Sequence, residues 1–145
     1  MNILDRIQSI LTGMVGAGNR ELKTVMYASP WDANVRLDRN PTPAAITYLL
    51  KGFEVDTETG MRRDRVDVEV FFCTRCDFAS KGEVIKGVME SVEPIVNDFI
   101  SLVYADNSFY VDGKIKAVAA YGKFDSNVCG YSVTMTLVDR VPHCI

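Results

Sequence analysis

The most constraining feature of the sequence is a strand-like pattern that leads, after a short connection, into a long helix-like pattern. Residues 65–72 read RVDVEVFF, with an apolar residue at every second position and with Asp67 and Glu69 between them. This alternation places the apolar side chains on one face of a β-strand and the two carboxylates on the other. The connection ends in Ser80 and Glu83, which have the spacing of a capping box at the start of a helix.

The segment after Glu83 carries a single apolar stripe. Its apolar residues recur at three- and four-residue spacing, which predicts a helix with one face toward a core. These residues are Ile85, Val88, Met89, Val92, Ile95, Val96, Phe99, Ile100 and Val103. Pro94 lies within the stripe, where it removes a backbone donor and clashes with the preceding turn, so we expect a kink or a break near residues 90–93. A half-buried strand followed by such a helix predicts a sheet covered by a helix.

Other segments are expected to add to this core. Asn2 is a suitable cap for a first helix whose apolar face extends from Ile3 to Met14. Alternating residues predict strands at residues 21–28, 109–111, 114–123 and 130–139. Asp112 and Gly113 have the composition of a tight turn, which predicts a hairpin between the second and third of these strands. The last residues, 142–145, are predicted to form a short tail.

Residues 43–55 fit two structures. Thr42 as a cap and Pro43 at the first position would begin a helix. Alternation of side chains through the segment favours a strand instead. We predict the strand, paired with residues 65–72 across a turn-rich stretch at residues 56–60.

Length and composition are typical of one globular domain. The chain has 145 residues, of which 48% are hydrophobic and 24% charged, and this argues against disorder. We therefore expect a single domain over residues 1–145. No stretch approaches the roughly 20 apolar residues that span a bilayer, and Asp5 and Arg6 lie within the first apolar turns, which is unlike a signal peptide. A soluble protein made in the cytoplasm, without a membrane partner, is the simplest expectation.

Few residues offer catalytic chemistry. The only histidine is His143, near the C-terminus, where chains are often mobile. The sequence contains no zinc-protease, calcium-loop, Walker or dinucleotide-binding motif. The formal net charge of -3 provides no general attraction for nucleic acid. We expect neither an enzyme nor a bound cofactor.

Cys73 and Cys76 form a Cys-x-x-Cys pair between the predicted strand and the long helix. In thioredoxin-like sites a helix N-terminus lowers the pKa of such a thiol, but the predicted helix cap comes several residues later here. A zinc site would need two more ligands, and Cys129, His143 and Cys144 form no second close pair. We expect free thiols, and a thiol-redox or zinc-binding domain remains a less favoured alternative.

Two long polar segments have no evident role in a core. Residues 29–42 include the only Trp, a residue type enriched at binding hot spots, although Trp31 pinned against the core is the simpler interpretation. The turn after residue 55 leads to a predicted hairpin tip that carries residues 61–64, which would be either solvated or an arm that reaches a neighbour. Residues predicted to contact another subunit are Trp31, Arg36, Glu58, Met61, Arg62, Arg63 and Asp64.

Three short segments, taken in their order along the chain, carry a resemblance to a known family. They are PAAITYLLKG at residues 43–52, MESVEP at residues 89–94 and GYSVTMT at residues 130–136, with Tyr121 and Asp125 before the last. In this pattern of hydrophobic residues, Pro and Gly, which spans most of the chain, the sequence resembles the tail terminator and tail completion proteins of long-tailed bacteriophages. The Cys-x-x-Cys pair is not part of the resemblance.

The resemblance implies an α+β fold, in which a mainly antiparallel sheet is flanked by an N-terminal helix and a long central helix. It also implies a virion structural protein without catalysis, which forms a homo-oligomeric ring, commonly a hexamer. Such a ring caps the tail tube and joins it to the head, so the implied partners are the tail tube protein and head-connector proteins. The resemblance implies no sequence-specific binding of nucleic acid, and a ring of this kind leaves an opening through which DNA can pass. The implied location is the virion tail, and the host cytoplasm during assembly of a phage or prophage. The alternative is a neck or adaptor ring subunit of a phage or injection machine.

Overall fold

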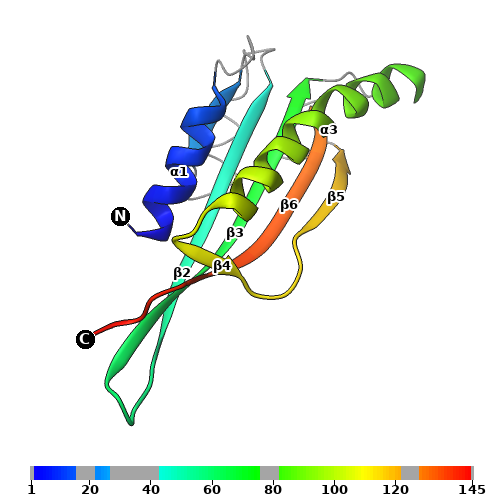
Figure 1. Cartoon of the computed structure of the whole chain (residues 1–145). Coiled ribbons are helices and arrows are strands. Elements are labelled where there is room, and N and C mark those ends of the chain that lie inside the picture. The colour runs from blue at the N-terminus through cyan, green and yellow to red at the C-terminus, as the bar shows by residue number, and fades with distance from the viewer. Residues whose placement is uncertain (1, 16–21, 27–42, 76–81, 122–127, 145) are drawn as a thin grey trace.

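The computed structural model describes residues 2–15, 22–26, 43–75, 82–121 and 128–144. In these residues the chain has an α+β fold, with two helices lying across one face of a seven-stranded sheet (Figure 1). The helices are α1 (Ile3–Met14) and α3 (Gly82–Ala105). The strands are β1 (Lys23–Met26), β2 (Ala44–Val55), β3 (Met61–Arg75), β4 (Phe109–Val111), β5 (Lys116–Tyr121), β6 (Val128–Asp139) and β7 (His143–Cys144). Within the described residues no helix is both long and apolar enough to cross a membrane.

The sheet is mainly antiparallel and has the strand order β1-β2-β3-β6-β4. Among the described strands, only the β1–β2 pair is parallel. β4 and β5 both pair with β6, at different points along its length, and β7 pairs with the start of β3 just beyond the end of β6. The sheet is therefore built around β3 and β6, and the shorter strands extend its ends.

The main core lies between the sheet and the two helices. The apolar face predicted for β3 is confirmed, because Val66, Val68, Val70 and Phe72 are all buried there. The ring of Phe72 packs against that of Phe99 in α3, with 5.1 Å between the ring centroids. α1 contributes Ile3, Ile7, Ile10, Leu11 and Met14, and α3 contributes Val92, Ile95, Val96, Phe99 and Val103. Burial of these apolar side chains holds both helices on the same face of the sheet.

A smaller buried cluster lies on the opposite face of the sheet. It consists of Ala44, Ile46, Phe71, Cys73 and Val128, all at the end of the sheet where β2 begins and β3 ends. This is the apolar cluster of the opposite face, on which Val138 is also buried near the other end of β6. Further along β3 this face presents polar side chains, which form the surface considered below.

The predicted start of the first helix is confirmed. Asn2 has an extended backbone, and its side-chain oxygen accepts a hydrogen bond from the backbone N–H of Asp5 at 2.9 Å. One turn later, the Arg6 guanidinium pairs with Asp106 just after α3. The cap begins α1, and the ion pair fixes it against the end of the other helix.

Three details of the sequence-based prediction are wrong, and one of its alternatives is excluded. Of the kink or break expected near residues 90–93, the break is absent, because α3 is continuous through Pro94, which is exposed. Cys73 lies inside β3 rather than in a connection, and His143 lies in a paired strand rather than a tail. Asp112 and Gly113 do form a bend, with a φ of 84° at Gly113, but the two strands beside it pair with β6 and not with each other.

Candidate functional site

The end of the β2–β3 hairpin projects beyond the helical layer as an arm (Figure 1). The arm consists of residues 50–55 of β2, the turn at residues 56–60 and residues 61–65 of β3, and its cross-strand pairs run from Gly52–Arg65 to Val55–Arg62. Residues 50–60 are all exposed. Met61 and its neighbours, predicted at the hairpin tip, belong to β3 instead, so the true tip is residues 56–60. The ladder between β2 and β3 continues for three pairs beyond Gly52–Arg65.

The tip is closed by local hydrogen bonds. The backbone N–H of Asp56 donates to the carbonyl of Met61 at 2.9 Å, and the N–H of Gly60 donates to the carbonyl of Asp56 at 2.7 Å. Gly60 has a φ of 69°, a left-handed conformation that glycine adopts without a steric penalty. The Asp56 carboxylate accepts from the N–H of Glu58, as expected for an Asx turn. The arm therefore ends in a defined turn.

A cluster of polar side chains around Asp64 lies on one face of the arm, on the same side of the sheet as the helices. Arg62 donates from Nε to Asp64 Oδ1 at 2.9 Å, and Lys51 Nζ lies 3.5 Å from Asp64 Oδ2. The Arg62 guanidinium also covers the ring of Phe53, with its carbon 3.8 Å from the ring centroid. The backbone N–H of Asp64 donates to the carboxylate of Asp139 in β6. These contacts join both strands of the arm to the body of the sheet.

Asp64 is only 7% exposed although the arm around it is open. Burial alone would raise the pKa of its carboxyl. The hydrogen bond from Arg62 and the charges of Lys51 and Arg62 act in the opposite direction and prevail, so the pKa of Asp64 lies below its ordinary value of 3.8. The cluster is therefore ionised near neutral pH, and it fixes Arg62 in a structural position.

The opposite face of the arm carries a second set of ion pairs. The Arg65 guanidinium donates to Asp112 at 2.5 Å and lies 3.6 Å from a Glu54 oxygen. The hydrogen bond to Asp112 raises the pKa of Arg65 above its ordinary value. Both partners are well exposed, so these pairs orient side chains and contribute little to stability.

β7 returns the end of the described chain to the arm. Cys144 pairs with Met61 and His143 with Arg62 in an antiparallel ladder. The Cys144 and Met61 sulfur atoms lie 3.8 Å apart. A third strand thus supports the start of β3, whereas a two-stranded ribbon alone is marginally stable in water.

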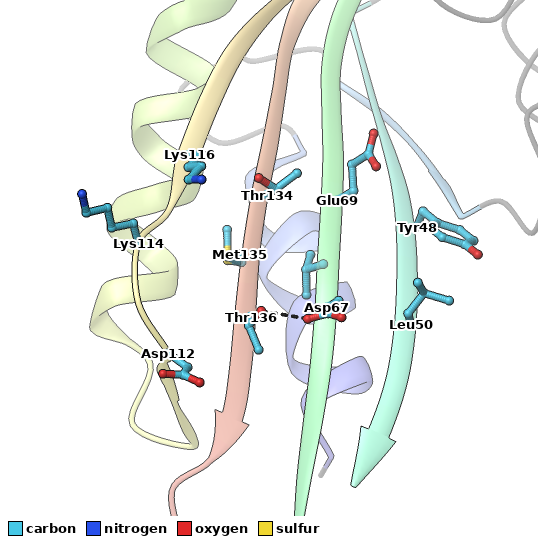
Figure 2. A pocket seen from close by; sticks show the side chains of 11 residues that line it. Tyr48, Leu50, Asp67, Glu69, Asp112, Lys114, Lys116, Thr134, Met135 and Thr136 are labelled. Atoms are coloured by element: carbon cyan, nitrogen blue, oxygen red, sulfur yellow. Dashed lines mark hydrogen bonds between the residues drawn. The ribbon is translucent and has the colours of Figure 1, made fainter.

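An open groove follows the polar face of the sheet above the arm, with a volume of about 380 Å³. Figure 2 shows Asp67 and Glu69 in the middle of this surface, Lys114 and Lys116 on the side of β5, and Tyr48 on β2. The Thr136 hydroxyl donates to Asp67 at 2.8 Å, and the Ser132 hydroxyl contacts Glu69 at 3.3 Å. The lining residues include neither histidine nor cysteine. Carboxylates, ammonium groups and hydroxyls therefore lie side by side on this surface.

The residues predicted to contact another subunit divide into three groups. Trp31 and Arg36 lie outside the described residues. Glu58 is exposed at the tip, and Met61 and Arg63 are half-buried on the polar side of the arm. Arg62 and Asp64 contact each other within the arm, so their charges serve its internal structure.

Sequence reasoning missed several exposed residues on these surfaces. Leu50, Phe53 and Val55 are 53%, 56% and 38% exposed, and all lie on the arm. Lys114 and Lys116 border the groove. The length of the strand predicted at residues 43–55 was a signal for the exposed residues of the arm. A strand of twelve residues is longer than the covering helices can bury.

The cysteines at described positions lie at two different ends of the sheet. Cys129 is disulfide-bonded, so the expectation of free thiols is wrong for this residue. Cys73 is a buried thiol at one end of β3, and His143 pairs with Arg62 near the other. They are separated by about 11 strand residues, or roughly 36 Å. Among the described residues, no three His, Cys, Asp or Glu side chains are grouped to hold a metal ion.

No protein-family model matches the chain, and no curated protein sequence matches it.

Proposed function

We propose that the protein is a structural subunit of a bacteriophage tail, a tail terminator or tail completion protein. Its copies form a ring that caps the tail tube and joins it to the head. The proposal begins from the resemblance carried by residues 43–52, 89–94 and 130–136. An α+β fold with a mainly antiparallel sheet and helices on one face agrees with what that resemblance implies.

The observation that supports the proposal most is the arm. Eleven consecutive residues, 50–60, are exposed there and add nothing to either buried cluster. The arm is nevertheless well ordered, because the contacts of Asp64, the pairing with β7 and the closed turn all support it. A structured projection without a core role is expected where a subunit holds a neighbour.

A second surface of different character is also present. The polar face of the sheet, with Asp67, Glu69, Lys114 and Lys116, is not covered by α1 or α3 (Figures 1 and 2). A head-to-tail ring needs two different patches on each subunit, so that one patch binds the other on the next copy. The arm and this sheet surface are two such patches.

The direct test is the mass of the protein in solution and its binding to tail tubes. We expect size-exclusion chromatography with light scattering to give one closed oligomer, and electron microscopy to show rings at one end of purified tubes. A ring that binds head connectors but not tube ends would favour the neck or adaptor alternative. A monomer at every concentration, with or without tubes, would exclude a ring subunit.

A shortened arm tests the role of the arm itself. Deletion of residues 54–55 together with residues 62–63 removes two cross-strand pairs, so the alternation of the strands and the turn at residues 56–60 are kept. We expect a folded monomer. The matched control is Tyr104→Ser, which removes an exposed aromatic side chain (77% exposed) at the end of α3 and should leave the ring intact. A ring that persists after the deletion would assign assembly to other surfaces.

A further inference from the structure

Both sides of the sheet end in strand segments that have no neighbouring strand among the described residues. On one side, β1 pairs with residues 44–47 of β2 and leaves residues 50–55 paired with β3 alone. On the other side, β5 pairs with β6 alone. The outer N–H and C=O groups of such segments can bind a further strand. We call these segments the β2 edge (residues 50–55) and the β5 edge (residues 116–121).

Both edges expose large apolar side chains and lack proline. Of the eight large hydrophobic side chains that are exposed in the described residues, four lie on these edges. They are Leu50, Phe53 and Val55 on the β2 edge and Val118, 62% exposed, on the β5 edge. Neither edge contains a proline, which proteins often use to block edge pairing. Each edge is six residues long, or about 20 Å.

The directions of the strands make the edges complementary between copies. β2 and β6 are both antiparallel to β3, and β5 is antiparallel to β6. β5 therefore runs opposite to β2. When a second copy is placed beside the first with its strands in the same direction, its β2 edge meets the first copy's β5 edge in antiparallel orientation. Each copy then uses one edge on each side, as a head-to-tail ring requires.

We infer that the β2 edge of one copy pairs with the β5 edge of the next, with Glu54 opposite Lys116. Side chains that are directly paired share a face of the sheet, and both of these lie on the polar face, as the registers Lys116–Thr134 and Gly52–Arg65 indicate. This register forms a new ion pair between exposed residues. This inference rests on the proposed ring.

The same register matches large side chains with small ones. Phe53 would lie opposite Ala117, and Leu50 opposite Ala120. Val118 would lie opposite Gly52, where an added Cβ would have its nearest neighbour 4.0 Å away, so there is room beside this backbone. Exposed apolar area on both edges would then be buried without steric conflict.

The pairing also sets how neighbouring copies are displaced. Within one copy the registers place Lys116 level with Thr134, Glu69 and Tyr48. In the proposed contact Lys116 faces Glu54 of the next copy, which lies six residues after Tyr48 along β2. The next copy is therefore displaced along the strand direction by about six residues, or roughly 20 Å. One copy spans about four strand spacings, or roughly 19 Å. The strands would therefore be inclined by about 45° to the ring axis, at the upper end of the tilt in closed barrels.

Disulfide trapping tests the register directly. Opposed residues in an antiparallel pair have Cα atoms about 4.5–5.5 Å apart, which suits a disulfide. In a Cys144→Ser background, we expect the variant Gly52→Cys/Val118→Cys to give a ladder of covalent oligomers on a non-reducing gel after mild oxidation. The control Gly52→Cys/Ala119→Cys places the second thiol on the other face of the sheet and should give none.

A charge exchange provides an independent measurement. Glu54→Lys alone and Lys116→Glu alone should each weaken association, by about two- to fivefold per contact for an exposed pair. An equimolar mixture of the two variants should restore association through rings in which the variants alternate, because each contact between different variants joins a Lys to a Glu. Only a contact between different copies predicts this rescue.

The outcomes separate this inference from the proposed ring. A ladder in the 52/118 variant together with rescue in the mixture supports edge pairing. If the wild type forms a ring but the folded variants give neither covalent oligomers nor restored association in the mixture, the edge pairing is overturned. The proposed ring is then unaffected. A monomeric wild type overturns both. Circular dichroism establishes that each variant is folded.

Discussion

Arg6 donates two hydrogen bonds to Oδ2 of Asp106, a residue one hundred positions away along the chain. The Arg6 Nε–Asp106 Oδ2 distance is 2.9 Å, and the backbone N–H of Ser108 donates to the other Asp106 oxygen at 2.8 Å. Asp106 is 8% exposed. This contact fixes the start of α1 to the end of α3, at the level where β4 begins.

Replacing Asp106 with Asn should destabilise the protein. The amide keeps one acceptor but loses the charge that Arg6 and the Ser108 N–H stabilise. Because the Arg6 side chain is 36% exposed, we expect a modest loss of about 1–2 kcal/mol in the free energy of unfolding, measured by urea titration. Glu93→Gln, at an exposed position of α3, is the control and should change stability by less than about 0.5 kcal/mol. Equal losses in both variants would contradict a specific role for Asp106.

Stability should fall in acid through the same carboxylate and through Asp64. Burial raises the pKa of Asp106, but hydrogen bonds from Ser108 and Arg6 prevail and lower it below 3.8. A carboxyl group with a lowered pKa in the folded state stabilises the fold above its unfolded pKa, and this contribution disappears as the pH falls through the folded pKa. We therefore expect thermal stability to decline below about pH 4. The loss of thermal stability with falling pH should be shallower in Asp106→Asn than in the wild type. Identical slopes in the two proteins would contradict a contribution from the Asp106 carboxylate.

Thr47→Val should stabilise the protein. Thr47 is 1% exposed on the helix side of β2, and its hydroxyl is buried without a hydrogen-bond partner. Valine removes this unsatisfied group and has a similar shape, so we expect a gain of about 1 kcal/mol in chemical denaturation. Thr136→Val is the matched control, since the Thr136 hydroxyl donates to Asp67. Thr136→Val should not increase the free energy of unfolding. An increase of similar size in this control would indicate that valine is favoured at strand positions in general.

Gly130 and Gly87 should respond to alanine in opposite directions. A Cβ at Gly130 would lie 1.8 Å from the carbonyl oxygen of Phe72, so β3 and β6 would have to move apart. We expect Gly130→Ala to cost about 3 kcal/mol, at the upper end of overpacking effects. No atom lies within 4 Å of a Cβ at Gly87 in α3, where alanine should add about 0.5–1 kcal/mol through helix propensity. Thermal unfolding of both variants measures the difference, and a stable Gly130→Ala protein would show that the two strands can separate at little cost.

The elements that follow from side-chain periodicity were predictable from the sequence. Residues 65–72 alternate over a buried face, and the stripe from Ile85 to Val103 repeats at helical spacing, so their element types follow from local patterns. Asn2, a residue type that caps helices, also predicts the start of the first helix. Each of these signals lies within a few residues of the structure that it specifies.

The parts that failed depend on distant partners. Asp112 and Gly113 suit a hairpin turn, but the strands on either side of them both pair with β6, Tyr110 with Val138 and Ala117 with Val133. His143 has no strand signal of its own and pairs because the arm presents an open edge. Pro94 is tolerated on the exposed side of a helix that core packing stabilises over 24 residues.

The candidate surfaces were only partly predictable for a related reason. The sequence indicates that residues 56–60 form a turn, but not that the arm extends beyond the helices. That depends on where α1 and α3 end relative to β2. The charges of Arg62 and Asp64 looked like contacts for a neighbour, and the structure joins them to each other.

The pairing of β7 with the arm has a practical consequence for how the protein is handled. His143 and Cys144 pair with Arg62 and Met61, beside the turn at the tip of the arm. A purification tag or fluorescent reporter fused behind these residues would begin next to the arm and crowd whatever binds there. Labels are better attached elsewhere, because a fusion at this end could be mistaken for a loss of assembly.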